Sequence, residues 1–289
     1  MLYKHMEDGQ ILTDMTFLME NYDNDYYNTE DMKGLLFDLT ELSVSHGFEG
    51  NLWHTYLTYL LASHENAYST SCEITGAIDG SLNQVALHDF EIFKELFDYD
   101  FRKMEEAFGV DCISMIKEYA GDSSHGNVFN KRIRDRICDL AKSLAEAEDA
   151  QDFKEKITGF YKEFGVGKLG LHKAFRIEHT DESAQIVPIT KIAHVHLDDL
   201  VGYEIAKKKL IDNTKAFVEG KRANNCLLFG DAGTGKSTSI KAILNQYYDQ
   251  GLRMIEVYKH QFQDLNDVIA QIKNRNYKFI IYMDDLSFE

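Results

Sequence analysis

The sequence lacks the features of a secreted or membrane protein. Its N-terminal residues contain no apolar run like that of a signal peptide, and no stretch approaches the roughly 18 apolar residues of a membrane helix. The four cysteines, Cys72, Cys112, Cys138 and Cys226, form no C-x-x-C pair, which favours reduced thiols. We therefore predict a soluble cytoplasmic protein that makes no membrane contact.

Basic residues are scarce in the first 170 positions, which hold 15 Lys and Arg against 32 Asp and Glu. The rest of the chain holds 16 of each sign, so the whole net charge of −17 belongs to the first part. Because an acidic surface repels phosphate backbones, we expect no direct nucleic-acid binding. A solvated surface is the simplest interpretation, and the alternative is a surface that binds a protein partner rich in basic residues.

Aromatic residues in the first part recur at steps of three and four, the spacing of one helix face. Two stripes follow this pattern, namely Phe90, Phe93, Phe97, Phe101 and Met104, and then Phe153, Ile157, Phe160 and Phe164. We interpret both stripes as core. The pattern predicts an acidic, all-α N-terminal domain over residues 1–165.

Proline occurs only once, at Pro188, among short apolar runs. Three glycines between positions 165 and 170 precede it and favour a joint between domains. The residue before a proline disfavours helix, so we predict extended chain or an edge hairpin over 174–192. Residues 166–197 are thus expected to form a linker with short extended segments.

Strands and helices are predicted to alternate in the last part of the chain. The pattern predicts helices at 203–219, 236–248 and 265–274, and strands at 226–229, 254–258 and 279–283. Such alternation indicates a parallel sheet. The prediction for residues 198–289 is therefore an α/β domain.

The segment from Gly230 to Ser237 matches the phosphate-binding pattern G-x-x-x-x-G-K-[ST] at every fixed position. Glycines let the backbone amides converge on phosphates, and the next helix adds its positive N-terminal end. We expect Lys236 to reach the β- and γ-phosphates of ATP and the Ser237 hydroxyl to bind Mg²⁺. The predicted nucleotide contacts are Gly230, Asp231, Ala232, Gly233, Thr234, Gly235, Lys236, Ser237 and Thr238. A chance match is the alternative, and the predicted strand before and helix after the loop argue against it.

Two carboxylates, Asp284 and Asp285, follow the last predicted strand. The carboxyl end of a parallel strand faces the ligand crevice, so we predict Asp284 as a Mg²⁺ ligand. Many P-loop ATPases have a catalytic Glu at the position of Asp285, whose side chain is one methylene shorter. Asp285 either acts in hydrolysis, with Glu289 as a substitute acid, or only caps the next turn.

Four segments of the last part occur in a recognisable order. They are Asp198-Asp199-Leu200-Val201-Gly202-Tyr203-Glu204, Asn213-Thr214-Lys215-Ala216-Phe217, the P-loop, and Asp284-Asp285-Leu286-Ser287-Phe288-Glu289. From about residue 170 onward, the chain resembles an uncharacterised bacterial family of AAA-type ATP-binding proteins that carries a domain-of-unknown-function label. The resemblance implies an AAA+ core and places Val201, Gly202 and Tyr203 near the adenine.

The resemblance also implies parts that the sequence does not contain. After the strand that ends before Asp284, an AAA+ core adds two strands, a sensor residue, an arginine finger and a helical lid. One added strand lies between the P-loop strand and the Asp284 strand, so we expect these two to leave backbone groups unpaired. We therefore expect a truncated chain that binds nucleotide weakly without hydrolysing it, and an oligomer only in the complete protein.

Several functions stay open at this level. The leading hypothesis is an AAA+-type ATPase that, when complete, couples hydrolysis to a protein partner held by the acidic helical domain. A nucleotide-dependent switch with little hydrolysis is the alternative that Asp285 favours. A P-loop kinase is less favoured because the sequence shows no motif for a phosphate acceptor, and a GTPase is disfavoured because no N-K-x-D follows the loop. A vestigial loop is disfavoured because Lys236, Ser237 and Asp284 are all intact.

Overall fold

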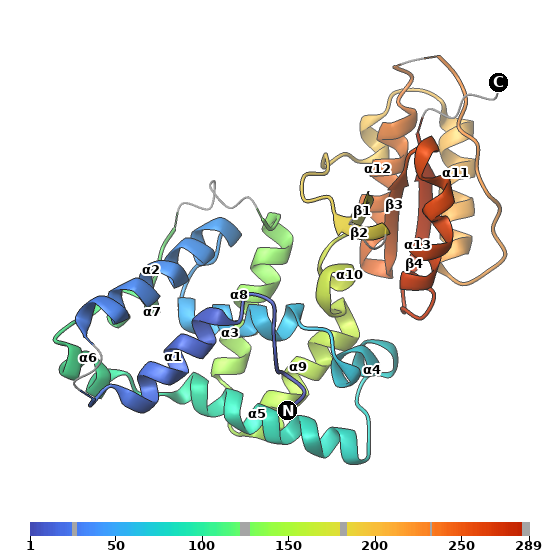
Figure 1. Ribbon diagram of the computed structural model, residues 1–289. Helices are drawn as coiled ribbons and strands as arrows, with labels where there is room; N and C mark the ends of the chain where they lie inside the picture. The colour runs from blue at the N-terminus through green and yellow to red at the C-terminus, as the bar shows by residue number, and fades with distance from the viewer. Residues whose placement is uncertain (25–27, 122–127, 180–183, 232, 285–289) are drawn as a thin grey trace. The chain divides into compact units, whose positions relative to one another are not determined.

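The computed structural model (Figure 1) describes residues 1–24, 28–121, 128–179, 184–231 and 233–284. The chain divides into two units, Met1–Gly167 and Lys168–Glu289. In the part described, the first unit has helices but no named strand, and the second holds a four-stranded sheet with helices. The coarse prediction of a helical part followed by an α/β part is confirmed.

Nine named helices run through the described residues of the first unit. They are α1 (Gln10–Asn21), α2 (Thr29–His46), α3 (Leu52–Ser63), α4 (Ala67–Thr75), α5 (Ser81–Asp98), α6 (Arg102–Phe108), α7 (Cys112–Lys117), α8 (Lys131–Ala145) and α9 (Ala150–Phe164). Side chains of Asn28 and Asn66 cap α2 and α4 by accepting backbone N–H groups of the first turn. None of the described helices is both long and apolar enough to cross a membrane.

Both predicted aromatic stripes lie in the core of the first unit, where α5 packs on α9. The ring of Phe153 meets those of Phe97 and Phe90, with centroids 5.1 and 6.1 Å apart, and all three are buried. The first stripe, however, is not a single helix, because Tyr99 has extended backbone angles and ends α5. The break lets Phe101 pack edge-on against Trp53 at 6.1 Å.

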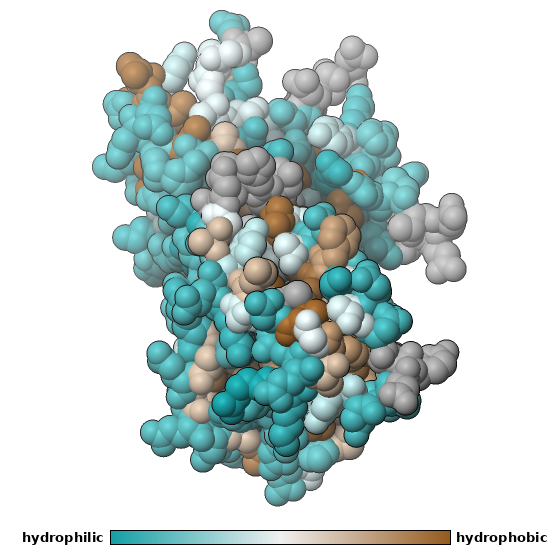
Figure 2. Space-filling view, turned by 90° about the vertical axis from the view of Figure 1, so that its left-hand side faces the viewer, coloured by the Kyte–Doolittle hydropathy of each residue, from teal (hydrophilic) through white to brown (hydrophobic). Residues whose placement is uncertain are grey.

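The acidic charge of the first unit lies at its surface. Among its described Asp and Glu residues, the buried ones are Glu73 and Asp89. Glu73 accepts the backbone N–H of Val166 at 3.1 Å. The face of the molecule seen in Figure 2 is mostly hydrophilic, with small apolar areas between the polar ones.

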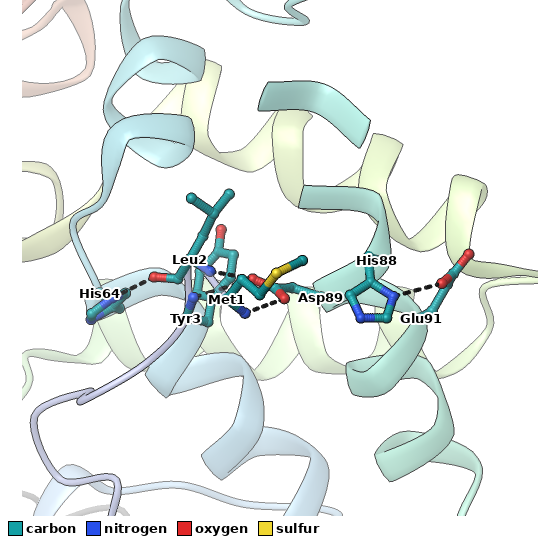
Figure 3. Close-up of polar contacts among 7 residues, drawn as sticks. All are labelled: Met1, Leu2, Tyr3, His64, His88, Asp89 and Glu91. Atoms are coloured by element: carbon teal, nitrogen blue, oxygen red, sulfur yellow. Dashed lines mark hydrogen bonds and ion pairs between the residues drawn. The ribbon is translucent and has the colours of Figure 1, made fainter. Parts of the chain in front are cut away.

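Asp89 ties the N-terminal residues to α5 (Figure 3). Its side chain is 3% exposed and accepts the N–H groups of Leu2 at 2.5 Å and Tyr3 at 3.3 Å, and it also pairs with the Met1 ammonium. The Tyr3 hydroxyl lies 2.9 Å from that of Tyr161. A buried carboxylate is stable only where such donors replace water, so this contact is a specific fastening of the N-terminal segment.

We expect the substitution Asp89→Asn to lower the free energy of unfolding by about 2 kcal/mol. The uncharged amide cannot make the charge-assisted hydrogen bonds of the carboxylate, and its NH₂ group would face the N–H donors of the N-terminal segment. Urea unfolding followed by circular dichroism measures this loss. Glu91→Gln is the matched control, since Glu91 lies on the same helix but is exposed. Equal losses in the two variants would contradict the role given to Asp89.

The second unit is built on a sheet of strand order β2-β1-β3-β4. The elements in chain order are α10 (Gly167–Leu171), β1 (Ala174–His179), β2 (Ala184–Pro188), η1 (Leu197–Asp199), α11 (Glu204–Val218), α12 (Lys236–Tyr247), η2 (Tyr248–Gln250), β3 (Leu252–Val257), η3 (Lys259–Asp264), α13 (Leu265–Ile272) and β4 (Lys278–Met283). Strands β1 and β2 pair antiparallel, whereas β1 with β3 and β3 with β4 pair parallel. The prediction of a parallel sheet thus holds for β1, β3 and β4 but is wrong for β2, whose antiparallel pairing makes the sheet mixed.

Helices cover both faces of this sheet. Alternate residues of β3 point to opposite sides, so that Ile255 and Val257 pack with Val268 of α13, while Leu252 and Met254 pack with α12. All but one residue of β3 are buried. A strand covered on both faces is mostly apolar, as Leu252, Met254, Ile255 and Val257 are, and Arg253 and Glu256 are the two charged exceptions in β3.

The predicted hairpin around Pro188 is confirmed. Pro188 ends the edge strand β2 and lies opposite Phe175 of β1, where the missing proline N–H costs no bond to a further strand. The predicted helices at 203–219, 236–248 and 265–274 and the strands at 254–258 and 279–283 also form, with ends shifted by a few residues.

The strand predicted at Cys226–Phe229 is wrong. This segment has no strand geometry, and Leu227 and Phe229 are 64% and 88% exposed. A strand needs a neighbour for its backbone groups, and the described sheet ends at β2 and β4, neither of which pairs with this segment.

A buried cation, Arg253 of β3, fastens the start of the second unit. Its guanidinium donates to the carbonyls of Leu169 and Gly170 and lies over the rings of Tyr248 and Tyr277 at 4.2 and 4.3 Å. His172 lies nearby. Burial, and then the positive charge of Arg253, lowers the pKa of His172 to about 4.

This low pKa makes stability depend on pH. Unfolded His172 has an ordinary pKa near 6.5, so between about pH 6.5 and 4 the unfolded chain binds the proton and the folded chain does not. Above pH 6.5 His172 is neutral in both states, so its burial carries no protonation penalty. As the pH falls from about 6.5 to 4, the free energy of unfolding decreases by up to about 3 kcal/mol.

We expect His172→Gln to flatten the pH dependence of the urea midpoint in this window relative to the unmodified protein. His260→Gln is the control, because His260 is exposed and should leave the pH profile unchanged. Identical profiles for the protein and the His172 variant would show that burial of this ring does not destabilise the charged form.

Candidate phosphate-binding site

The loop Gly230–Ser237 leads directly into α12. Gly230, Gly233 and Gly235 have φ angles of 141°, 79° and 81°, a region that side chains with a Cβ rarely occupy. Gly235 is the N-cap of α12, and no side chain in the described residues caps this helix end. The first-turn amides therefore have the orientation and the positive dipole end that suit an anion.

Lys236 lies at the inside of this loop. Its Nζ donates to the carbonyl oxygens of Gly230 at 2.9 Å and Asp231 at 2.8 Å. Thr234 braces the loop from the other side through a bond from its Oγ1 to the Asp231 carbonyl at 2.9 Å. The ammonium is thus held at the concave side of the glycine-rich turn by neutral acceptors, which phosphate oxygens would outcompete.

The structure brings together two predicted site residues that are 47 positions apart. The Ser237 hydroxyl donates to Asp284 Oδ2 at 3.4 Å, from the first turn of α12 to the residue that follows β4. A hydroxyl and a carboxylate are hard oxygen donors, which is the ligand type that Mg²⁺ takes alongside phosphate oxygens. The donor set therefore fits Mg²⁺.

Sequence reasoning missed a third member of this contact, Tyr282. Its hydroxyl donates to Ser237 Oγ at 3.0 Å. Burial raises the pKa of Tyr282 to about 12, so the hydroxyl keeps its proton at neutral pH. The available signal was strand alternation, which puts residues 282 and 284 on the same side of the chain.

The segment predicted to contact adenine follows a residue that touches the loop. A Cβ at Gly235 would lie 3.1 Å from Leu200 Cδ2, and Lys207 Nζ holds the Leu200 carbonyl at 2.7 Å. Val201 and Tyr203 are 94% and 65% exposed. Tyr203 has a left-handed backbone, φ 57°, which is uncommon for an aromatic residue.

The chain before Leu200 is fastened to α12 by Asn245. The Asn245 amide donates to the carbonyls of Ala193 at 3.1 Å and Val195 at 3.0 Å, and its oxygen accepts from Lys173 Nζ at 2.5 Å. Asn245 of α12 thus binds both Lys173, the residue before β1, and the segment that leads from β2 to Leu200. This anchoring fixes where Leu200 meets the loop.

The remaining predicted residues have simpler outcomes. Thr238 lies in the first turn of α12, and Gly202 has a φ of 85°. Ala232, Asp285 and Glu289 lie outside the described residues, so the structure gives no position for the acid expected to act in hydrolysis.

Comparison with known proteins gives a limited answer. Residues 170–289 match a family model described as "protein of unknown function (DUF815)". The resemblance to a family with a domain-of-unknown-function label is thereby confirmed over this stretch. No curated protein matches the chain, and no solved structure does.

Proposed function

We propose that the second unit binds ATP with Mg²⁺ at the loop Gly230–Ser237, as part of an AAA+-type P-loop domain. The observation that supports this best is the contact of Ser237 with Asp284. A chance glycine-rich turn requires no carboxylate from a distant strand. A hydroxyl and a carboxylate that meet at an uncapped helix end, after a loop that also holds a lysine ammonium, suit ATP·Mg²⁺.

Each residue has a role in this proposal. The loop amides and the start of α12 bind the phosphates, and Lys236 exchanges its bonds to Gly230 and Asp231 for phosphate oxygens. Ser237 and Asp284 would hold Mg²⁺, which neutralises phosphate charge when bound. The exposed side chains of Val201 and Tyr203 would cover the adenine, with Gly202 between them, which explains why these apolar groups face solvent.

We expect ATP hydrolysis to act on a protein partner of the acidic helical unit. The alternative is a switch that binds ATP with little turnover, which the shorter Asp285 favours over a glutamate. A single-turnover assay decides between them. Phosphate release that disappears in Lys236→Ala and Asp284→Asn supports hydrolysis, and recovery of intact bound ATP supports the switch.

The binding itself is tested by thermal unfolding. At a concentration about 100 times Kd, ATP·Mg²⁺ stabilises the folded state by about 2.7 kcal/mol, so we expect the Tm to rise by several degrees over Mg²⁺ alone. Lys236→Ala should abolish the rise, because the ammonium is the main phosphate partner.

Lys209→Ala is the matched control for charge, since Lys209 is an exposed residue of α11. It should retain the full rise. If ATP·Mg²⁺ raised the Tm no more than Mg²⁺ alone, or if the Lys236 variant kept the rise, the proposed site would be wrong.

A further inference from the structure

The geometry around Ser237 Oγ leaves a single place for a cation. A hydroxyl has one hydrogen and two lone pairs. The hydrogen of Ser237 goes to Asp284, and one lone pair accepts the hydroxyl of Tyr282 at 3.0 Å. The second lone pair is left for a ligand, and the two neighbours determine its direction.

Ser237 is directed differently from two other helical hydroxyls of this unit, those of Ser239 and Thr214. Ser239 Oγ donates back to the Gly235 carbonyl at 2.8 Å, and Thr214 Oγ1 to the Leu210 carbonyl at 2.8 Å. Such back-bonding within the helix is the usual alternative for serine and threonine. Ser237 points toward the end of β4 instead, which requires partners there.

Tyr282 is the more firmly held of these two partners. It lies within β4, opposite Glu256 of β3 in the parallel ladder, whereas Asp284 comes after the last strand residue. The Tyr282 side chain also packs against the apolar cluster that contains Ala242 and Ile243 of α12. Its hydroxyl is therefore a fixed point against which the serine is oriented.

We infer that Tyr282 is a positioning residue that sets the Mg²⁺ affinity of the ATP site by holding the hydroxyl of Ser237. The inference rests on the proposed ATP·Mg²⁺ binding and adds a determinant that neither the loop motif nor the aspartate contains. Tyr282 touches neither nucleotide nor metal in this role. It acts through Ser237 and also contacts Asp284, both of which are proposed metal ligands, so its effect should be confined to the metal.

The test is Tyr282→Phe, which keeps the ring and its packing and removes one hydroxyl. Binding of a fluorescent ATP analogue is measured across a Mg²⁺ titration and again in EDTA. We expect the half-saturating Mg²⁺ concentration to rise about three- to tenfold, the size of one lost hydrogen bond, with the affinity in EDTA unchanged. Mn²⁺ binding in the presence of ADP, followed by electron paramagnetic resonance, should weaken by a similar factor.

Two further variants make the result specific. Tyr258→Phe removes a hydroxyl from a half-exposed tyrosine of the same unit and should match the unmodified protein. In a Ser237→Ala background, Tyr282→Phe should have a clearly smaller effect on the Mg²⁺ requirement, because its hydrogen bond to Ser237 is gone.

The outcomes separate this inference from the proposed function. If the unmodified protein binds the ATP analogue with Mg²⁺ but Tyr282→Phe leaves the Mg²⁺ requirement unchanged, the inference alone is wrong. A loss of affinity in EDTA as well would show a general structural role and also overturn it. If the unmodified protein does not bind the analogue, the proposed function and the inference fail together.

Discussion

The contact between the start of α12 and the end of β4 is the interaction on which the candidate site depends. Ser237, Tyr282 and Asp284 meet there through hydrogen bonds of 3.0 and 3.4 Å. Without that contact, the glycine-rich loop would be an isolated turn at a helix end. With it, the glycine-rich loop is oriented relative to a carboxylate, and two hard oxygen donors lie within one hydrogen bond of each other. The geometry is set by the backbone of a sheet and a helix, which deform little, so the site is largely pre-formed.

Several interior contacts hold α12 and β4 in that relation. The apolar cluster beneath α12 joins residues of β1, β3 and the helix, with the Tyr282 ring at its margin. Asn245 fastens the segment that carries Leu200 to the loop, and Arg253 fastens the start of the unit to β3. These polar groups are buried or partly buried and each is satisfied by carbonyl oxygens, so they specify position as well as contributing stability. A substitution at Asn245 would therefore release the segment that carries Leu200, although Asn245 itself does not contact the loop.

The first unit presents a different combination of core and surface. Its interior is built from aromatic rings of α3, α5 and α9, while its acidic side chains lie mainly at the surface. Such a unit needs no further partner to bury its core. The charge that remains outside disfavours nucleic acid and suits a partner with basic residues, as the composition already indicated.

The sequence by itself determined the features that depend on neighbouring residues. The glycine pattern of 230–235, the helical stripes and the edge strand ending at Pro188 all follow from local conformational preferences, so they were predictable. The proximity of Ser237 and Asp284 was expected from the loop motif and from the position of Asp284 at the carboxyl end of a predicted strand. Tertiary structure alone decided the rest. Cys226–Phe229 forms no strand because an apolar run needs a paired neighbour, and Phe101 leaves the α5 helix because it packs on Trp53. Tyr282 reaches Ser237 only because the register of β4 on β3 and the position of α12 bring residues 45 positions apart within one hydrogen bond. No local pattern contains that distance.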